Sequence, residues 1–193
     1  MIYFVRHGES QANVDNIFAG PGYPAPLSHK GREQAKAAGF ELKSNNTIID
    51  YIVASPMERA KETAMIIADV IDFNTDSIRY DDRLAEHDMG SLNGKTMIGV
   101  TMGRQITEAE GAESPEDFQR RVLEALRALA TLPGNVLIVS HGGVGRIVEA
   151  TRKGIELADF YDIAGYPNAK VILLDADRSY SPSNVEDLPG AAA

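Results

Sequence analysis

The residues best suited to chemistry follow a short apolar stretch at the start of the chain. Arg6, His7 and Gly8 come directly after Ile2 to Val5, a run that is typical of a buried strand. A guanidinium and free backbone N–H groups bind phosphate oxygens, and a glycine lets the backbone approach a ligand closely. Only His7 has a side chain that could attack an electrophile. This stretch therefore predicts an anion site with a candidate nucleophile.

Three further candidates lie far along the sequence. His141 follows a second apolar run, Arg59 lies one turn into a predicted helix, and Glu86 lies on a loop at 84–90. In an open α/β sheet, ligands bind outside the carboxyl ends of the strands. We therefore expect these side chains to meet His7 in one crevice.

The elements that must position these residues alternate between strands and helices. Strands are predicted at 2–5, 48–54, 78–80, 136–140 and 170–175, and helices at about 28–42, 56–71, 115–129 and 143–153. This alternation predicts an α/β fold with three layers, α/β/α, in which helices cover both faces of a mostly parallel sheet.

Serines mark three of the predicted helix starts. Ser28 and Ser114 are expected to be N-caps. The stretch Ser55-Pro56-Met57-Glu58 offers a capping serine, a proline at the first helical position and a glutamate that closes a capping box.

The length favours one domain. With 193 residues the chain can bury one sizeable core but not two comfortable ones, so we predict a single domain over 1–176. Residues 87–113 are expected to form a short insertion over the active site, since the end of this stretch has no clear helical or strand periodicity. Residues 177–193 are expected to form a flexible tail.

Composition narrows the possible functions. The net charge of −9 argues against nucleic-acid binding, and the absence of cysteine rules out disulfides and thiolate catalysis. No leader or membrane span is expected, so the predicted location is the cytoplasm, with no nucleic-acid or membrane partner. The histidines, His29 and His87 included, lack metal-ligand spacing, so no metal is predicted. The oligomeric state, monomer or homodimer, is left open.

Each candidate also has an ordinary structural explanation. Arg6, His7, Arg59 and Glu86 could be surface or loop residues, the stretch 140–143 a tight turn, and Ser10 and Asn13 turn or helix caps. His87 could line the pocket beside Glu86. Together, the ordinary explanations require several coincidences in one chain.

The order of these motifs resembles the histidine phosphatase superfamily, the phosphoglycerate-mutase-like enzymes. The matching positions are Arg6-His7-Gly8-Glu9-Ser10 with Asn13, Pro26-Leu27-Ser28 with Gly31, Ser55-Pro56 with Arg59-Ala60 and Thr63-Ala64, Leu84 with Glu86, Gly90 and Gly94, and Ser140-His141-Gly142-Gly143. They cover residues 1 to about 150.

The resemblance implies a role for each matching residue. His7 would become a phosphohistidine, with its other ring nitrogen held by a backbone carbonyl. Arg6, Arg59 and His141 would grip the phosphoryl oxygens. Glu86 would protonate the leaving group and then activate water. Asn13, Ser10 and Gly142 are expected to be further phosphate contacts.

Several reactions fit this set of residues. Hydrolysis of a small phosphorylated metabolite is favoured, because the short insertion offers Lys95 and Arg104 but also three glutamates, and so would hold a second acceptor poorly. The alternatives are mutase-type phosphoryl transfer, a protein phosphohistidine phosphatase and a non-catalytic phosphate-binding module. A cofactor, 2,3-bisphosphoglycerate, is expected only for the mutase.

Overall fold

A computed structural model of the chain describes residues 1–100 and 103–174. In the described part, a five-stranded sheet has the order β3-β2-β4-β1-β5. Its strands are β1 (Ile2–Arg6), β2 (Tyr51–Ala54), β3 (Arg79–Tyr80), β4 (Val136–Ser140) and β5 (Val171–Leu173). All neighbouring pairs are parallel except β1 with β5, which is antiparallel. The predicted α/β class with a mostly parallel sheet is confirmed.

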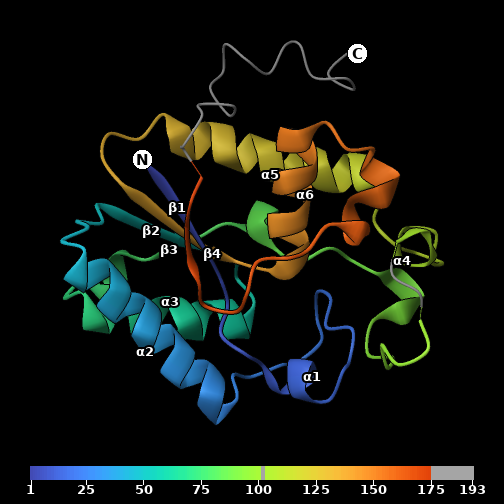
Figure 1. The fold of residues 1–193 in the computed structure, drawn as a ribbon, viewed down its shortest axis with the longest axis horizontal. Helices are drawn as coiled ribbons and strands as arrows, with labels where there is room; N and C mark the ends of the chain where they lie inside the picture. The colour runs from blue at the N-terminus through green and yellow to red at the C-terminus, as the bar shows by residue number, and fades with distance from the viewer. Residues whose placement is uncertain (101–102, 175–193) are drawn as a thin grey trace.

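Helices cover both faces of this sheet (Figure 1). The α-helices are α1 (Gln11–Val14), α2 (His29–Ser44), α3 (Glu58–Val70), α4 (Arg104–Thr107), α5 (Pro115–Ala130) and α6 (Gly142–Lys153). Short 3₁₀ helices are η1 (Thr75–Ser77), η2 (Asp82–Leu84), η3 (Gly90–Leu92) and η4 (Leu157–Asp162). The helices α2 and α3 lie on one face of the sheet, and α5 and α6 lie on the other.

Alternation along the strands divides the core into two parts. In β1, Phe4 packs in the cluster with α5 and α6, whereas Val5 packs in the cluster with α2 and α3. In β4, Ile138 and Val139 divide in the same way. Burial on both faces explains the continuous apolar runs that predicted these strands.

Two of the three predicted serine caps are present. The Ser28 hydroxyl accepts the Gly31 N–H at 3.0 Å, and the Ser114 hydroxyl accepts the Asp117 N–H at 3.1 Å. The cap predicted at Ser55 is wrong, because α3 begins at Glu58 and its N-cap is Met57. Ser55 lies in the preceding turn, where its hydroxyl accepts the Met57 N–H at 3.3 Å.

Predicted strand boundaries are less accurate. The second strand begins at Tyr51 rather than at residue 48, because Ile48 is 74% exposed and lies outside the sheet. The last predicted strand, 170–175, is reduced in the described residues to β5. The expected tail at 177–193 lies outside the described residues.

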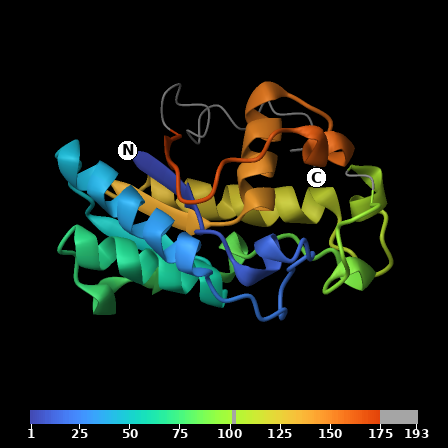
Figure 2. The ribbon, with the colours of Figure 1, turned by 60° about the horizontal axis from the view of Figure 1, so that its bottom comes forward.

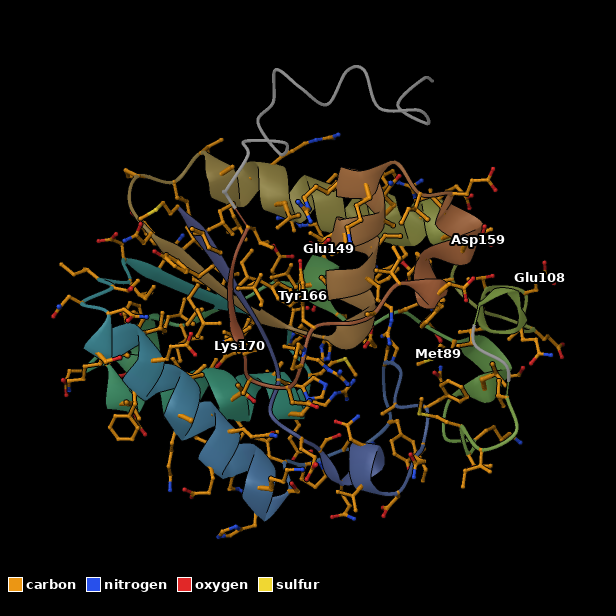
Figure 3. All side chains as sticks on the ribbon, in the orientation of Figure 1. Met89, Glu108, Glu149, Asp159, Tyr166 and Lys170 are labelled. Atoms are coloured by element: carbon orange, nitrogen blue, oxygen red, sulfur yellow. The ribbon has the colours of Figure 1, made fainter. Side chains whose placement is uncertain are left out.

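The expected insertion lies at the carboxyl edge of the sheet, beside α1 (Figure 2). Ile17 and Thr96 form an isolated β-bridge, and the Met97 N–H donates to the Asn16 carbonyl at 2.7 Å. Met89, near the start of this segment, is labelled in Figure 3. Among the described residues, no helix is long and apolar enough to cross a membrane.

Candidate active site

His7 lies immediately beyond β1, with a ring orientation set by two hydrogen bonds. Its Nδ1 lies 2.7 Å from the Gly8 carbonyl oxygen, and the Arg59 Nε–H donates to its Nε2 at 3.1 Å. A carbonyl oxygen can only accept and a guanidinium can only donate, so Nδ1 carries the proton and Nε2 carries the lone pair. The free lone pair of His7 is therefore on Nε2.

Arg6 and Arg59 bring two guanidinium groups close to His7. Arg6 Nη1 donates to the Tyr166 carbonyl at 3.2 Å, while its buried Nε has no hydrogen-bond partner. Arg59 Nη2 donates to the Ala19 carbonyl at 2.6 Å. A buried donor without a partner is costly, and an oxyanion would satisfy it.

His141 follows β4 as His7 follows β1, which places the two rings side by side. Arg6 and Ser140 are register partners in the sheet, and the ring centroids of the two histidines are 5.2 Å apart. His141 Nε2 lies 2.6 Å from the Ser55 hydroxyl, whereas its buried Nδ1 has no partner. The sequence pointed to Ser55 only as a cap; its contact with His141 joins the ends of β2 and β4.

Glu86 reaches the beginning of α6 from the loop after η2. The Gly143 N–H lies 3.0 Å from Oε1 and 3.2 Å from Oε2, and the His87 N–H donates to Oε1 at 2.9 Å. A Cβ atom on Gly143 would lie only 2.2 Å from Glu86 Oε1. The second glycine of the His141-Gly142-Gly143 motif thus makes room for this carboxyl group.

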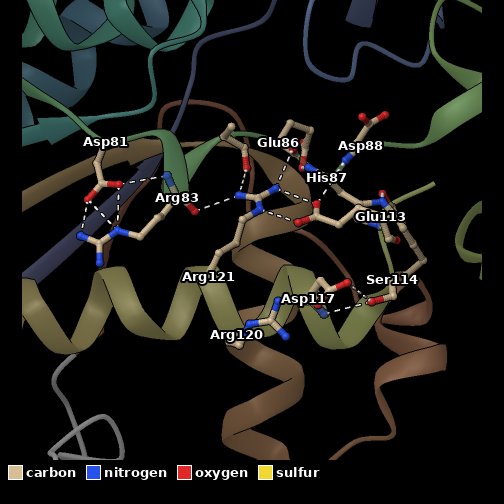
Figure 4. Close-up of polar contacts among 12 residues, drawn as sticks. Asp81, Arg83, Glu86, His87, Asp88, Glu113, Ser114, Asp117, Arg120 and Arg121 are labelled. Carbon is tan, nitrogen blue, oxygen red and sulfur yellow. Dashed lines mark hydrogen bonds and ion pairs between the residues drawn. The ribbon is translucent and has the colours of Figure 1, made fainter. Parts of the chain in front are cut away.

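Arg121 of α5 holds the loop that carries Glu86 (Figure 4). Its guanidinium donates to the carbonyl oxygens of Arg83, Ala85 and Glu86 at 2.8, 2.8 and 3.0 Å. It also forms two bonds to the Glu113 carboxylate, at 2.6 and 2.8 Å. All five N–H donors of Arg121 are used, so the loop is fixed to the outer helix layer.

Gly8 has a different role from the predicted one. It does not line the cavity; a Cβ atom there would lie 2.3 Å from the Gly31 carbonyl oxygen, so its lack of a side chain lets the loop pack against α2. The Gly8 N–H donates to the Thr63 hydroxyl at 3.0 Å, and Thr63 donates to the Arg59 carbonyl at 2.7 Å. These contacts couple the His7 loop to the helix that carries Arg59.

Ser10 and Asn13 form a capping box around α1. Ser10 is the N-cap, and its N–H and hydroxyl both lie 3.1 Å from Asn13 Oδ1. Both residues also line the cavity, as does Gly142 at the start of α6. The structure therefore shows the capping role of Ser10 and Asn13, while phosphate contact by these cavity-lining residues stays a prediction.

The predicted residues surround a cavity of about 110 Å³. Arg6, His7, Arg59 and Glu86 line it, and the His141 ring lies next to the His7 ring but is not itself part of the lining. Several further lining residues were not predicted from the sequence: Arg146, Ile17, Phe18, Ala19, Met89, Met97 and Tyr161. A signal for Arg146 was available, since it lies one turn after His141 on a helix that begins at the site.

The other two histidines lie away from the cavity lining. His87 is fully buried among Phe118, Phe160 and Tyr161, and its ring nitrogens lie 3.0 Å from the Tyr161 hydroxyl and 2.8 Å from the Glu113 carbonyl. It therefore packs behind the Glu86 loop rather than in the pocket. In the described part of the chain, no group of three His, Asp or Glu side chains could hold a metal ion.

Burial and positive charge keep the site histidines neutral. Burial lowers the pKa of His7 well below 6.5, and the charges of Arg59 and Arg6 lower it further. Burial lowers the pKa of His141 in the same way, followed by the charge of Arg59. A neutral His7 keeps its Nε2 lone pair available at neutral pH.

We expect the free energy of unfolding to fall as the pH is lowered from 7.5 to 5.5. The folded protein lowers the pKa of His7, His87 and His141, so below pH 6.5 the unfolded chain binds protons that the folded chain does not. This stabilisation is complete above pH 6.5 and is lost as the pH falls towards the folded-state values. Each histidine adds a slope of up to about 1.4 kcal/mol per pH unit.

Urea unfolding at pH 7.5, 6.5 and 5.5 in phosphate-free buffer measures this slope. A His141→Gln variant should show a shallower slope, because its unfolding takes up about one proton fewer. Equal stability at pH 7.5 and 5.5 in the unsubstituted protein would contradict the assignment of neutral buried histidines.

Comparison with known proteins agrees with this geometry. Residues 2–182 match the family model of the histidine phosphatase superfamily, branch 1. The probable phosphoglycerate mutase GpmB of Salmonella choleraesuis (strain SC-B67) is 34% identical over 154 residues, which cover 73% of this chain and 69% of that protein.

Solved structures show the same fold. YhfR of Bacillus stearothermophilus superposes with a TM-score of 0.77 at 28% identity, covering 88% of both chains. The mycobacterial glucosyl-3-phosphoglycerate phosphatase, solved in a complex with VO3, superposes with a TM-score of 0.72 at 26% identity, covering 88% of this chain and 90% of that one.

The family match spans nearly the whole described chain and includes every motif that carried the resemblance. The resemblance inferred from the motifs is thereby confirmed. The chain belongs to the histidine phosphatase superfamily, branch 1, and is an enzyme of that superfamily.

Proposed function

We propose that this enzyme hydrolyses phosphate monoesters of small metabolites through a phosphohistidine at His7. The observation that carries the proposal is the hydrogen bonding of the His7 ring. Its proton is on Nδ1, toward the Gly8 carbonyl, and its Nε2 lone pair lies in a cavity with the guanidinium groups of Arg6 and Arg59. This combination supplies a nucleophile and the charge that binds its target.

In the first step, His7 Nε2 attacks phosphorus in line with the ester oxygen. The N–P bond forms as the P–O bond to the alcohol breaks, and Glu86 donates its proton to the leaving oxygen. Arg59 exchanges its hydrogen bond to Nε2 for one to a phosphoryl oxygen. Arg6 Nε, which has no hydrogen-bond partner within the described protein, donates to another oxygen.

His141 assists as a neutral donor. When the Ser55 hydroxyl donates to His141 Nε2, the proton of that ring is on Nδ1 and can be donated to a phosphoryl oxygen. Ser55 is thereby a positioning residue, because it acts through the tautomer of His141.

In the second step, the Glu86 carboxylate takes a proton from water, which attacks phosphorus as the N–P bond breaks. Inorganic phosphate leaves, His7 regains its lone pair on Nε2, and Glu86 is again protonated. These steps use side chains alone and require no cofactor.

Mutase activity is the second candidate, because the relative GpmB is a probable phosphoglycerate mutase. The lining of the cavity favours hydrolysis. Among described residues, the insertion contributes Met89 and Met97 to the cavity, and Lys95 is exposed to solvent. Among the side chains that the structure describes, this segment brings no cation to the cavity that could hold the released alcohol, so water has easier access to the phosphohistidine.

Incubation with 3-phosphoglycerate and 2,3-bisphosphoglycerate tests this choice. We expect inorganic phosphate to accumulate with little 2-phosphoglycerate, measured together by ³¹P NMR. Appreciable isomerisation would favour the mutase. If neither product appears with these or other small esters, the hydrolase proposal fails.

A further inference from the structure

The cavity holds more positive charge than a phosphate monoester requires. Its charged lining residues, among those described, are Arg6, Arg59, Arg146 and Glu86. Neither Arg6 nor Arg59 nor Arg146 forms an ion pair with a carboxylate in the part of the chain that the structure describes. The guanidinium groups of Arg6 and Arg59 match the two negative charges of a phosphate monoester. One guanidinium is left over.

Arg146 is the guanidinium that the phosphoryl chemistry does not use. Its Nε donates to the Ile163 carbonyl at 3.0 Å, which anchors the side chain, and its Nη1 and Nη2 have no hydrogen-bond partner among the described residues. Arg146 is half-buried. Two parallel N–H donors on a fixed guanidinium are suited to a carboxylate or a phosphate.

Arg146 lies directly beside the phosphate-binding Arg6. A Cβ atom built on Gly142 would lie 3.3 Å from Arg146 Nη1 and 3.3 Å from the Cζ and Nε of Arg6, so both guanidiniums border the same point. The positive charge of Arg146 also lowers the pKa of Arg6, after the larger effect of burial. Placing two like charges together in a partly buried site is costly unless a ligand neutralises them.

We propose that Arg146 binds a second anionic group of the substrate, a carboxylate or phosphate close to the ester that is cleaved. The inference rests on the proposed hydrolase function and names its substrate class: small phosphate esters that carry an additional acidic group. Gly142 is a glycine because a side chain would fill the space between the two guanidiniums. The apolar residues of the lining would then contact the carbon skeleton.

A matched pair of substrates tests this assignment. 3-Phosphoglycerate and glycerol 3-phosphate differ by a carboxylate in place of a hydroxymethyl group. We expect kcat/KM of the unsubstituted enzyme to be at least about tenfold higher for 3-phosphoglycerate, which corresponds to one charge-assisted pair. In Arg146→Gln this ratio should fall to about one, mainly through KM for the acidic ester.

Two further variants separate binding from folding. Arg146→Lys retains the charge and should restore part of the preference. Arg152→Gln removes the same charge from the outer part of α6, away from the cavity, and should leave the ratio at its original value. The proposal is overturned if Arg146→Gln keeps the full preference, or if the unsubstituted enzyme shows none.

Binding measurements test the Arg146 subsite independently of the proposed hydrolase activity. Calorimetric dissociation constants for the two esters, measured on His7→Ala with and without Arg146→Gln, report the preference without turnover. If no ester is hydrolysed but the affinity preference depends on Arg146, the subsite stands and the hydrolase proposal fails. If hydrolysis occurs with no such preference in rate or affinity, the subsite is wrong and the hydrolase stands.

Discussion

His7→Ala is expected to abolish turnover, with a loss of about four orders of magnitude or more, and to eliminate the acid-labile phosphoenzyme. Among the described residues that line the cavity, only His7 carries a nitrogen lone pair at neutral pH. The remaining nitrogens are guanidinium or amide groups, or belong to the backbone, and none is a nucleophile. Stopped-time assays with ³²P-labelled substrate, quenched in alkali to preserve phosphohistidine, measure both losses.

His29→Ala is the matched control, since His29 is the first residue of α2 and does not line the cavity. It should retain both the activity and the labelled intermediate. His7→Ala should still bind inorganic phosphate, because Arg6 and Arg59 remain. A phosphoenzyme that survives in His7→Ala would move the nucleophile elsewhere and refute the proposed route.

The sequence was sufficient to predict the elements that converge on the site. The apolar runs before His7 and His141 are buried on both faces, and that pattern indicates parallel strands. Once both strands are placed in one parallel sheet, their carboxyl ends lie at the same edge, and the two imidazoles lie close together because β1 and β4 are neighbours. The apolar runs and the geometry of a parallel sheet were enough to predict that His7 and His141 lie at the same edge of the sheet.

The supporting contacts could not be predicted in the same way. Ser55 was interpreted as a helix cap because that is the usual role of serine before Pro-x-Glu, and its contact with His141 depends on which strand lies next to β2. Arg121 is one of several charged residues on an amphipathic helix, and only the path of a distant loop distinguishes it. Such contacts depend on tertiary placement, which residue spacing does not encode.

The glycine of the first motif illustrates the same limit. Gly8 was expected to face the ligand, whereas it faces the backbone of Gly31. Both interpretations rest on close backbone approach, which a glycine permits. The sequence indicates that something comes close to Gly8 but not what, and the partner became visible only when α2 was placed against the loop.

Glu86→Gln is expected to lower kcat for alkyl phosphates by about two to four orders of magnitude, because the amide can neither donate the required proton nor accept one from water. The change should leave the site intact. Oε1 accepts the His87 and Gly143 N–H groups and would be retained, while the amide nitrogen would take the place of Oε2, which has only the 3.2 Å contact to Gly143. Inhibition by inorganic phosphate should therefore be largely unchanged.

The two roles of Glu86 can be separated by changing the leaving group. p-Nitrophenolate leaves without protonation, so Glu86→Gln should still form the phosphohistidine from p-nitrophenyl phosphate, while its hydrolysis, which needs the base, remains slow. Stopped-flow absorbance should then show a burst of p-nitrophenolate equivalent to one site, followed by a slow phase. Glu108 is an exposed acid of the insertion at 87–113 (Figure 3), and Glu108→Gln should show neither effect. Equal losses for both leaving groups, without a burst, would mean that Glu86 acts by holding the site together rather than by moving protons.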